Sequence, residues 1–188
     1  MAETGSGKTA AYLIPVLARL QHLKEQERWR SQHVEELDAV AGSRGRAALV
    51  NGGPAGLILC PTRELAVQID GEVHALISKS KTGNTNENLN LRHILLAGGF
   101  DKTEQYKALK VGVDLAVCNP GRLIDLATMK GMEDVLQKVV VAVVDEADKM
   151  VQMGFESQLR SILGALRPDR LTCMFSATFP PRYASITE

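Results

Sequence analysis

The fold is decided by residues 139–148, which read Val-Val-Val-Ala-Val-Val-Asp-Glu-Ala-Asp. The first six are all apolar, and a short apolar run without alternation is typical of a strand buried on both faces of a sheet. Acids that follow such a strand lie at the carboxyl edge of the sheet, where open α/β sheets bind their ligands. Asp145 is expected to hold Mg2+ there, partly through water, and Glu146 to polarise an attacking water as general base. By itself, the tetrapeptide also fits a charge cluster at a helix N-terminus.

Similar apolar runs recur along the chain, separated by longer amphipathic segments. Besides Val139–Val144, strands are expected at Gly56–Cys60, Leu91–Ala97, Val113–Cys118 and Leu171–Phe175. Helices are expected at Arg63–Ser78, Lys102–Lys110, Gly121–Lys130 and Gly154–Leu166. This alternation predicts an α/β fold, with a mostly parallel sheet and helices on both faces. The polar residues that follow each strand should therefore meet at one edge.

The chain begins with a glycine-rich stretch, Ala2-Glu3-Thr4-Gly5-Ser6-Gly7-Lys8-Thr9, followed by a helical apolar pattern at Ala10, Leu13, Ile14, Leu17 and Leu20. Backbone amides of such a loop and the next helix N-terminus bind phosphates, which here would be those of ATP. Lys8 is expected to reach the β- and γ-phosphates, as a third catalytic candidate beside Asp145 and Glu146, and the Thr9 hydroxyl to ligate Mg2+. Ala2 stands where the general pattern has its first glycine, and Gly-Ser-Gly also occurs in plain linkers.

Hydroxyl residues follow the last apolar run, at Ser176-Ala177-Thr178. They are placed to hydrogen-bond the acids and to couple a nucleotide site to a moving part. Turn or cap residues explain the tripeptide equally well.

Composition restricts the partners and the compartment. Lys plus Arg (22) equals Asp plus Glu (22), so phosphate binding must come from local groups and not from overall charge. Three scattered cysteines argue against a disulfide framework and against zinc, and Cys60 and Cys118 are expected to be buried thiols. No apolar stretch reaches the roughly 18 residues of a membrane helix, and the N-terminal residues do not resemble a signal peptide, so cytoplasm or nucleus is expected.

Further motifs identify a family. With Pro61-Thr62-Arg63-Glu64-Leu65-Ala66, Gly98-Gly99 and Pro120-Gly121-Arg122, the motifs stand in the order found in DEAD-box ATP-dependent RNA helicases. The chain resembles their N-terminal RecA-like lobe over nearly its whole length, apart from the segment 24–54. The resemblance implies a RecA-like P-loop NTPase fold and ATP hydrolysis with Mg2+, coupled to RNA unwinding or remodelling. A DNA helicase or another P-loop ATPase does not predict this set of motifs together.

The resemblance also implies roles for individual residues. RNA would be held by its sugar-phosphate backbone, without base reading, by Pro61, Thr62, Arg63, Gly98, Gly99, Asn119, Gly121 and Arg122. Asn119 replaces the threonine usual in the family, and its amide can still donate to a phosphate. Asp148, Ser176 and Thr178 match the groups that couple hydrolysis to strand separation. Without the resemblance, Arg63 and Arg122 would fit surface salt bridges as well.

Against the family pattern, residues 1–188 are expected to form a partial ATP-binding lobe, with 24–54 as an extension of the first helix followed by a flexible insertion. The strand before the P-loop, the adenine-recognising segment and the second lobe have no counterpart within these residues. The expected partners are RNA, the second lobe and protein cofactors, and the chain alone should be inactive or very weak. The alternative is a catalytically inactive RNA-binding or protein-interaction module.

Overall fold

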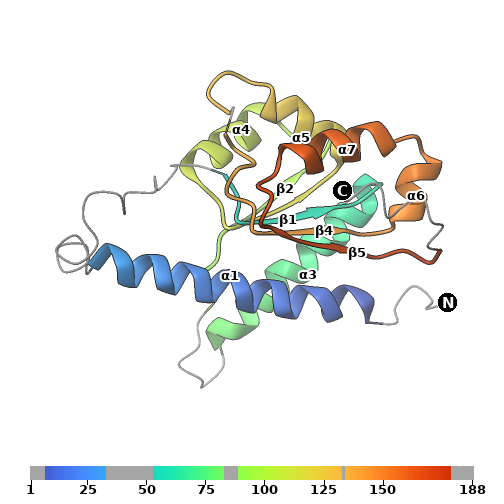
Figure 1. Ribbon diagram of the computed structural model, residues 1–188. Coiled ribbons are helices and arrows are strands. Elements are labelled where there is room, and N and C mark those ends of the chain that lie inside the picture. The colour runs from blue at the N-terminus through green and yellow to red at the C-terminus, as the bar shows by residue number, and fades with distance from the viewer. Residues whose placement is uncertain (1–6, 33–52, 83–88, 133, 179–188) are drawn as a thin grey trace.

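Five parallel strands form the sheet in the computed structural model of the chain, which describes residues 7–32, 53–82, 89–132 and 134–178 (Figure 1). The strands run in the order β2-β3-β1-β4-β5. Their bounds are β1 (Gly56–Leu59), β2 (His93–Leu96), β3 (Leu115–Cys118), β4 (Val141–Val144) and β5 (Leu171–Met174). All four pairings are parallel, so every strand ends at the same edge of the sheet.

Helices cover both faces of this sheet, as Figure 1 shows. On one face lie α1 (Lys8–Gln32) and α3 (Arg63–Thr82). The other face is covered by α4 (Lys102–Val111), α5 (Pro120–Ala127) and α7 (Glu156–Ala165), with the short α6 (Ala147–Gln152) at its end. The expected α/β architecture with helices on both faces is therefore confirmed.

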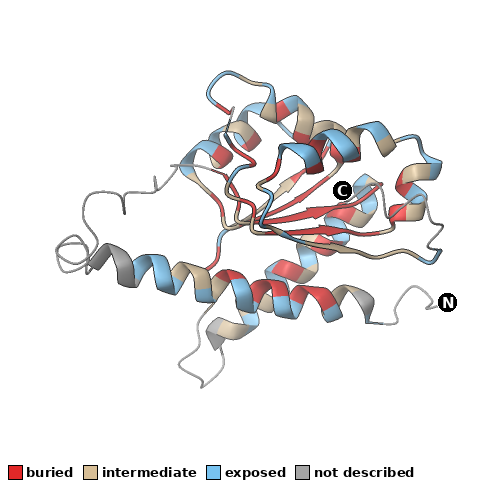
Figure 2. Ribbon diagram, in the orientation of Figure 1, coloured by how far each residue is buried: buried red, intermediate tan, exposed pale blue. Residues whose placement is uncertain are grey.

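The protein has two hydrophobic cores, one on each face of the sheet, because successive residues of the central strands point to opposite faces. In β4, Ala142 and Val144 face the core under α4, α5 and α7, whereas Val141 and Val143 face the core under α1 and α3. Because each strand residue packs on one helical layer or the other, β1, β3 and β4 are buried throughout (Figure 2). This double burial explains why their sequences are continuously apolar. Cys60 and Cys118 are free and buried, as expected.

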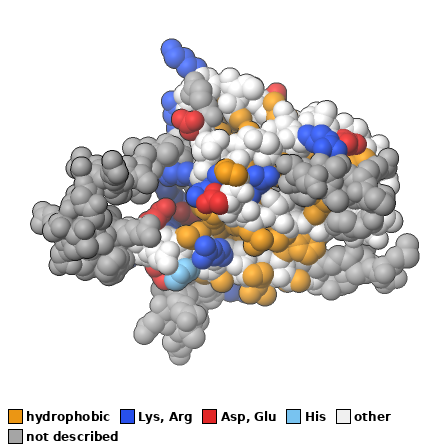
Figure 3. Space-filling model, viewed as in Figure 1, with side chains coloured by type: hydrophobic (Ala, Val, Ile, Leu, Met, Phe, Trp, Pro, Cys, Tyr) orange, Lys and Arg blue, Asp and Glu red, His pale blue; other side chains and the backbone are white. Residues whose placement is uncertain are grey.

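The outer side of β5 differs from the central strands. Leu171 is 62% exposed, and among the described residues no strand pairs beyond β5. Ile14 on α1 is 58% exposed. Where β5 and α1 lie in Figure 1, Figure 3 shows a band of hydrophobic side chains on the surface. The inclusion of Ile14 in the apolar face of the first helix was wrong, because Val16 occupies that face together with Leu13, Leu17 and Leu20.

The remaining differences concern where elements end. Helix α3 runs to Thr82 and not to Ser78, since no Gly or Pro stands between Ser78 and Gly83 to interrupt it. Helix α1 continues to Gln32, so the charged segment after Lys24 begins as the expected helical extension. Residues 33–52 of the predicted insertion lie outside the described part of the chain, and residues 53–54 are buried beside β1. No described helix has the length and hydrophobicity that a membrane span requires.

Candidate functional site

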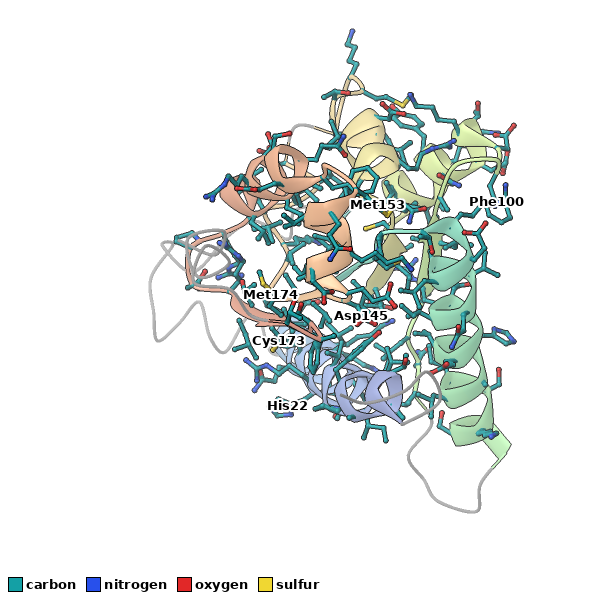
Figure 4. All side chains as sticks on the ribbon, turned by 90° about the vertical axis from the view of Figure 1, so that its right-hand side faces the viewer. His22, Phe100, Asp145, Met153, Cys173 and Met174 are labelled. Atoms are coloured by element: carbon teal, nitrogen blue, oxygen red, sulfur yellow. The ribbon has the colours of Figure 1, made fainter. Side chains whose placement is uncertain are left out.

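The candidate site lies along the carboxyl edge of the sheet, where Figure 4 shows Asp145 near the middle and Phe100 toward one side. The polar segments that follow the strands meet here because the strands are parallel. Backbone bonds hold the edge together: the amide of Asp145 donates to the Leu59 carbonyl and that of Asn119 donates to the Leu96 carbonyl. The sequence expectation that these segments share one edge is thus met by the topology.

Helix α1 begins directly after Gly7, whose φ of 77° is one that residues with a side chain rarely adopt. One turn later, the buried Tyr12 hydroxyl donates a hydrogen bond of 2.9 Å to Asp145 Oδ2 across 133 residues of sequence. Burial, and then the charge of Asp145, raise the pKa of Tyr12 far above its ordinary value, while a hydrogen bond from Thr9 acts in the opposite direction. The start of the glycine-loop helix and the first acid therefore lie against each other.

Asp145 is nearly enclosed, with 8% of its surface exposed. Its Oδ1 accepts from the amide of Glu146 at 2.9 Å, and its Oδ2 accepts from Tyr12. After burial itself, the charges of Asp145 and Glu146 raise the pKa of the Cys60 thiol, which lies behind them. The Cys60 thiol therefore stays protonated, so it lines the site as an uncharged group and does not act as a nucleophile.

Glu146 has a left-handed backbone, with φ 52° and ψ 49°, which no other non-glycine residue in the described ranges shares. Such a conformation costs on the order of 1–3 kcal/mol and is concentrated at functional sites. Its Oε2 lies 3.2 Å from Lys149 Nζ, yet it has no hydrogen-bond partner of good geometry. The contact is therefore an ion pair without an aligned hydrogen bond.

The third acid, Asp148, is bound to the segment after β5. Asp148 Oδ2 accepts from the Thr178 amide at 3.2 Å and from the Thr178 hydroxyl at 3.3 Å. The Asp148 amide donates to Ser176 Oγ at 3.2 Å. Burial acts to raise the pKa of Asp148, but the hydrogen bonds from Lys149, Ser176 and Thr178 outweigh it and lower that pKa. The hydroxyls therefore contact the acids, as expected, and Asp145, Glu146 and Asp148 form what we call the acid cluster.

The donor set of this cluster fits Mg2+. Asp145 of the cluster supplies a carboxylate, and Thr9, in the first turn of α1, supplies a hydroxyl; Tyr12 on the same helix donates to Asp145. Among the described residues, no group of three or more His, Cys, Asp or Glu side chains could hold a metal alone. Mg2+ suits such a sparse set, because it usually keeps several waters and takes one or two carboxylates together with substrate phosphates.

On the other side of the edge, Arg63 begins α3 after Thr62, whose hydroxyl accepts from the Leu65 amide as a helix cap. The Arg63 guanidinium lies 4.7 Å from the centre of the Phe100 ring. Gly99 makes this possible, because a Cβ there would overlap Arg63 Nη1, and its φ is 80°. The neighbouring Gly98 has open space around it.

Arg122 approaches the same segment from α5. Its Nη1 donates to the Phe100 carbonyl at 3.3 Å and to Gln105 Oε1 at 3.2 Å. Gln105, buried on α4, in turn donates to the Ala97 carbonyl. Among the described residues, neither Arg63 nor Arg122 forms an ion pair. We call these two side chains the arginine cluster; both are held by uncharged groups, so their charge is uncompensated within the described ranges.

The other predicted RNA-binding residues lie around this cluster. Asn119 caps α5 without a side-chain cap bond, and its Nδ2 donates inward to the Cys60 carbonyl at 2.9 Å. Pro61 is buried at the end of β1. Gly121 lies in the first turn of α5, and a Cβ at this position would lie 3.8 Å from Gln158 Oε1. The inward bond of Asn119 ties β1 to β3 and occupies one of its two N–H groups.

Part of the predicted phosphate loop, Thr4, Gly5 and Ser6, lies outside the described residues, as does the side chain of Lys8. Sequence reasoning missed three residues: Tyr12, Phe100 and Gln105. Tyr12 and Gln105 had a usable signal, since each carries a polar group on the apolar face of a helix, and buried polar groups need partners. Phe100 had none, because an exposed aromatic after two glycines indicates only a turn.

Comparison with known proteins agrees with this geometry. The family model described as DEAD/DEAH box helicase matches residues 1–186. The chain is 38% identical over 186 residues to the pre-mRNA-processing ATP-dependent RNA helicase PRP5 of Candida glabrata, covering 98% of this chain and 19% of that protein. It is 41% identical over 179 residues to the ATP-dependent RNA helicase DDX42 of Gallus gallus, covering 95% of this chain and 16% of that protein.

Solved structures give the same result. The yeast DEAD-box splicing factor Prp28 superimposes with a TM-score of 0.69 at 34% identity, covering 99% of this chain and 37% of that one. A DEAD box protein from Methanococcus jannaschii gives 0.65 at 31% identity, covering 99% of this chain and 40% of that one. The chain thus spans less than a fifth of the curated relatives named above and less than half of these structures.

Proposed function

Because the chain belongs to the DEAD/DEAH box helicase family, we propose that it is the ATP-binding lobe of an ATP-dependent RNA helicase. In this proposal the lobe binds MgATP and the backbone of single-stranded RNA, and a second lobe is needed for hydrolysis and unwinding. The relatives PRP5 and DDX42 are ATP-dependent RNA helicases by name, which supports the enzyme class.

The observation that carries the proposal is the hydrogen bond of Tyr12 to Asp145. It brings the N-terminus of α1, where phosphates would bind, against the acids that follow β4. A phosphate loop and a buried acid at a shared sheet edge form the minimum of a nucleoside triphosphate site. A linker or a helix-cap charge cluster would not require this contact.

Within the site, each residue has a role that its environment suits. The amides of residues 4–7 and the start of α1 bind phosphate oxygens, and Lys8 neutralises the β- and γ-phosphates. Thr9 and Asp145 hold Mg2+, which stabilises negative charge on the phosphates when bound. Glu146 takes a proton from the attacking water, since its Oε2 lacks an aligned hydrogen-bond donor.

Coupling and RNA binding follow from the other contacts. Asp148 joins the acid cluster to Ser176 and Thr178, so a change at the nucleotide is transmitted to the segment after β5. Uncompensated arginines suit phosphate contacts, which position a strand without reading its bases. RNA lies across the arginine cluster and the glycine turn, with Pro61, Thr62, Gly98, Gly99, Asn119 and Gly121 close to the backbone and Arg63 and Arg122 on the phosphates. No observation on the described residues favours the alternative of an inactive module, since the acids and hydroxyls are in bonding contact.

The test is calorimetric titration of MgADP into the protein and into Lys8→Ala. We expect wild-type binding, and at least about a tenfold loss in Lys8→Ala, because a phosphate-contacting cation is removed. Lys107→Ala is the matched control: Lys107 is exposed, pairs with Glu104, and belongs to α4, which covers the face of the sheet opposite to α1. Absence of MgADP binding by folded wild-type protein would contradict the nucleotide assignment.

A further inference from the structure

Tyr12 is a buried residue beside the acid cluster to which the proposed reaction gives no role. It is 3% exposed, and its hydroxyl donates to Asp145, one of the two residues expected to ligate Mg2+. We propose that Tyr12 is a positioning residue, whose hydroxyl sets the orientation of both Thr9 and Asp145 toward Mg2+. This inference rests on the proposed function, because it concerns the metal that accompanies the nucleotide.

The first half of the proposal concerns Asp145. A carboxylate at the end of a short side chain can rotate unless both oxygens are held. Here Oδ1 accepts from the Glu146 amide at 2.9 Å, and Oδ2 accepts from the Tyr12 hydroxyl at 2.9 Å. With both oxygens anchored, the plane of the carboxylate is set before any ligand arrives. A carboxylate oxygen has two lone pairs, so these bonds leave it able to bind a metal or a metal-bound water as well.

The second half concerns Thr9. A hydroxyl has one proton and two lone pairs, and it ligates a cation through the oxygen. Thr9 lowers the pKa of Tyr12 as a hydrogen-bonding neighbour. The Tyr12 hydroxyl already donates to Asp145, so toward Thr9 its oxygen can only accept. A Thr9 hydroxyl that donates to Tyr12 keeps its lone pairs available for Mg2+. Phenylalanine can neither donate to Asp145 nor accept from Thr9, so it cannot replace these two contacts of Tyr12, which we call the relay.

The surroundings hold the relay in place. The Tyr12 ring packs against Phe175, with centroids 5.0 Å apart and planes at 42°. The Phe175 carbonyl accepts from the Ala147 amide within the acidic tetrapeptide. Tyr12 thus contacts the segment after β5, which is itself bonded to the start of α6. The isosteric change to phenylalanine would keep this packing while removing only the relay.

The experiment compares wild type, Tyr12→Phe and Tyr106→Phe in the whole protein that carries this chain. ADP affinity is measured by calorimetry with Mg2+ and with EDTA, and the ratio of the two Kd values gives the contribution of the metal. Tyr106→Phe is a matched control, since it also removes one tyrosine hydroxyl, bonded at 3.0 Å to the Lys130 carbonyl far from the site. Thermal melting of each protein is recorded alongside.

For Tyr12→Phe we expect the Mg2+ contribution to fall about three- to tenfold, as for one lost hydrogen bond to a charged group, with Kd in EDTA within about twofold of wild type. Tyr106→Phe should change neither value. Calorimetric Kd reports on folded molecules only, so a partly unfolded variant lowers the stoichiometry and leaves the ratio interpretable.

Two results overturn the inference alone. The first is an unchanged Mg2+ ratio in Tyr12→Phe; the second is an equal loss of affinity with Mg2+ and with EDTA, which would mark a structural role. A wild-type protein whose ADP affinity does not respond to Mg2+ would overturn the proposed metal site, and the inference with it.

Discussion

The acid cluster and the arginine cluster lie at the same edge of the sheet, but the protein holds their charges differently. Asp145 is buried and accepts from a hydroxyl and a backbone amide. Arg63 is exposed and is held by the face of a ring, and Arg122 is held by a carbonyl and an amide oxygen. In the acid cluster Glu146 pairs with Lys149, whereas neither arginine pairs with an acid among the described residues.

The two clusters differ in how deeply their charged groups are buried. A buried carboxylate with anchored oxygens suits a small cation that reaches it from one direction. Arginines on the surface suit a long polyanion, because an extended backbone must contact several groups at once. A protein with no net charge can therefore bind nucleic acid through two locally uncompensated side chains. The following changes test that contrast, in order of decreasing expected effect.

Glu146→Gln tests whether the acid cluster performs proton transfer. ATP hydrolysis in the whole protein should fall by about 100-fold or more, the usual contribution of a general base. MgADP affinity, measured by calorimetry, should stay within about twofold, since the amide keeps the shape of the side chain. Lys149→Gln removes the ion pair and keeps the carboxylate, so its hydrolysis rate should stay near wild type. Hydrolysis by Glu146→Gln at the wild-type rate would remove the base assignment.

Gly99→Ala tests the support of the arginine cluster. The added Cβ would contact Arg63, and the alanine backbone would have to adopt a φ of 80°. The free energy of unfolding should therefore fall by about 1–2 kcal/mol in urea titrations. RNA affinity should fall as well, because Arg63 is displaced. Gly154→Ala is the control, because Gly154 has a similar φ of 83° and open space around it, so only Gly99→Ala also meets Arg63. If the two variants lose stability and RNA affinity equally, the contact of the added Cβ with Arg63 contributes to neither.

Phe100→Leu tests the ring beneath Arg63 alone. Loss of a cation–π contact worth about 0.5–1 kcal/mol should weaken binding of single-stranded RNA about two- to fivefold in fluorescence titrations. The salt dependence of binding should not change, because Arg63 keeps its charge. Phe100→Tyr keeps the aromatic face and should bind as wild type does. A weaker MgADP affinity in Phe100→Leu would contradict the independence of the two clusters.

Thr178→Val tests the hydrogen bond between Asp148 and the segment after β5, for which we expect the smallest effect. The hydrogen bonds lower the folded-state pKa of Asp148, so their contribution to stability is present at neutral pH and is lost as pH falls through that lowered pKa. Removing the Thr178 hydroxyl should reduce the free energy of unfolding by about 0.5 kcal/mol at pH 7, with the difference from wild type vanishing in acid. Thr128→Val, which loses a hydroxyl bonded to the Ile124 carbonyl, should show no such pH dependence. A difference that persists in acid would exclude the charged form of Asp148 as its source.

The elements of the fold could be predicted because their signals are local. The apolar runs placed all five described strands, since burial on both faces leaves a continuous pattern. Element ends were less predictable: α3 runs to Thr82 because a polar composition alone does not end a helix. The short α6 had no separate signal, since Ala147–Gln152 is too brief to show a helical period.

Some residues of the site could likewise be predicted from the sequence, and others could not. Asp145 and Glu146 could be named from the sequence, because they directly follow a buried strand and carry the required chemistry. Arg63 and Arg122 were named only through the resemblance to the helicase family. The direction of a side chain could not be predicted. Nothing in the sequence indicated that the Asn119 amide donates to the carbonyl of Cys60, which follows β1 and is 59 residues away. That partner exists only because β1 and β3 are adjacent in the sheet.

By itself, the sequence determined the strand and helix types, the parallel sheet and the edge at which the polar segments lie, because periodicity and motif order depend on residues close in the chain. Only the tertiary structure decided which groups touch: Tyr12 with Asp145 across 133 residues, and Phe100 with both Arg63 and Arg122. Those contacts depend on how helices from distant parts of the chain pack on the sheet. A hydrogen bond of 2.9 Å tolerates little displacement, and no local pattern records its second partner.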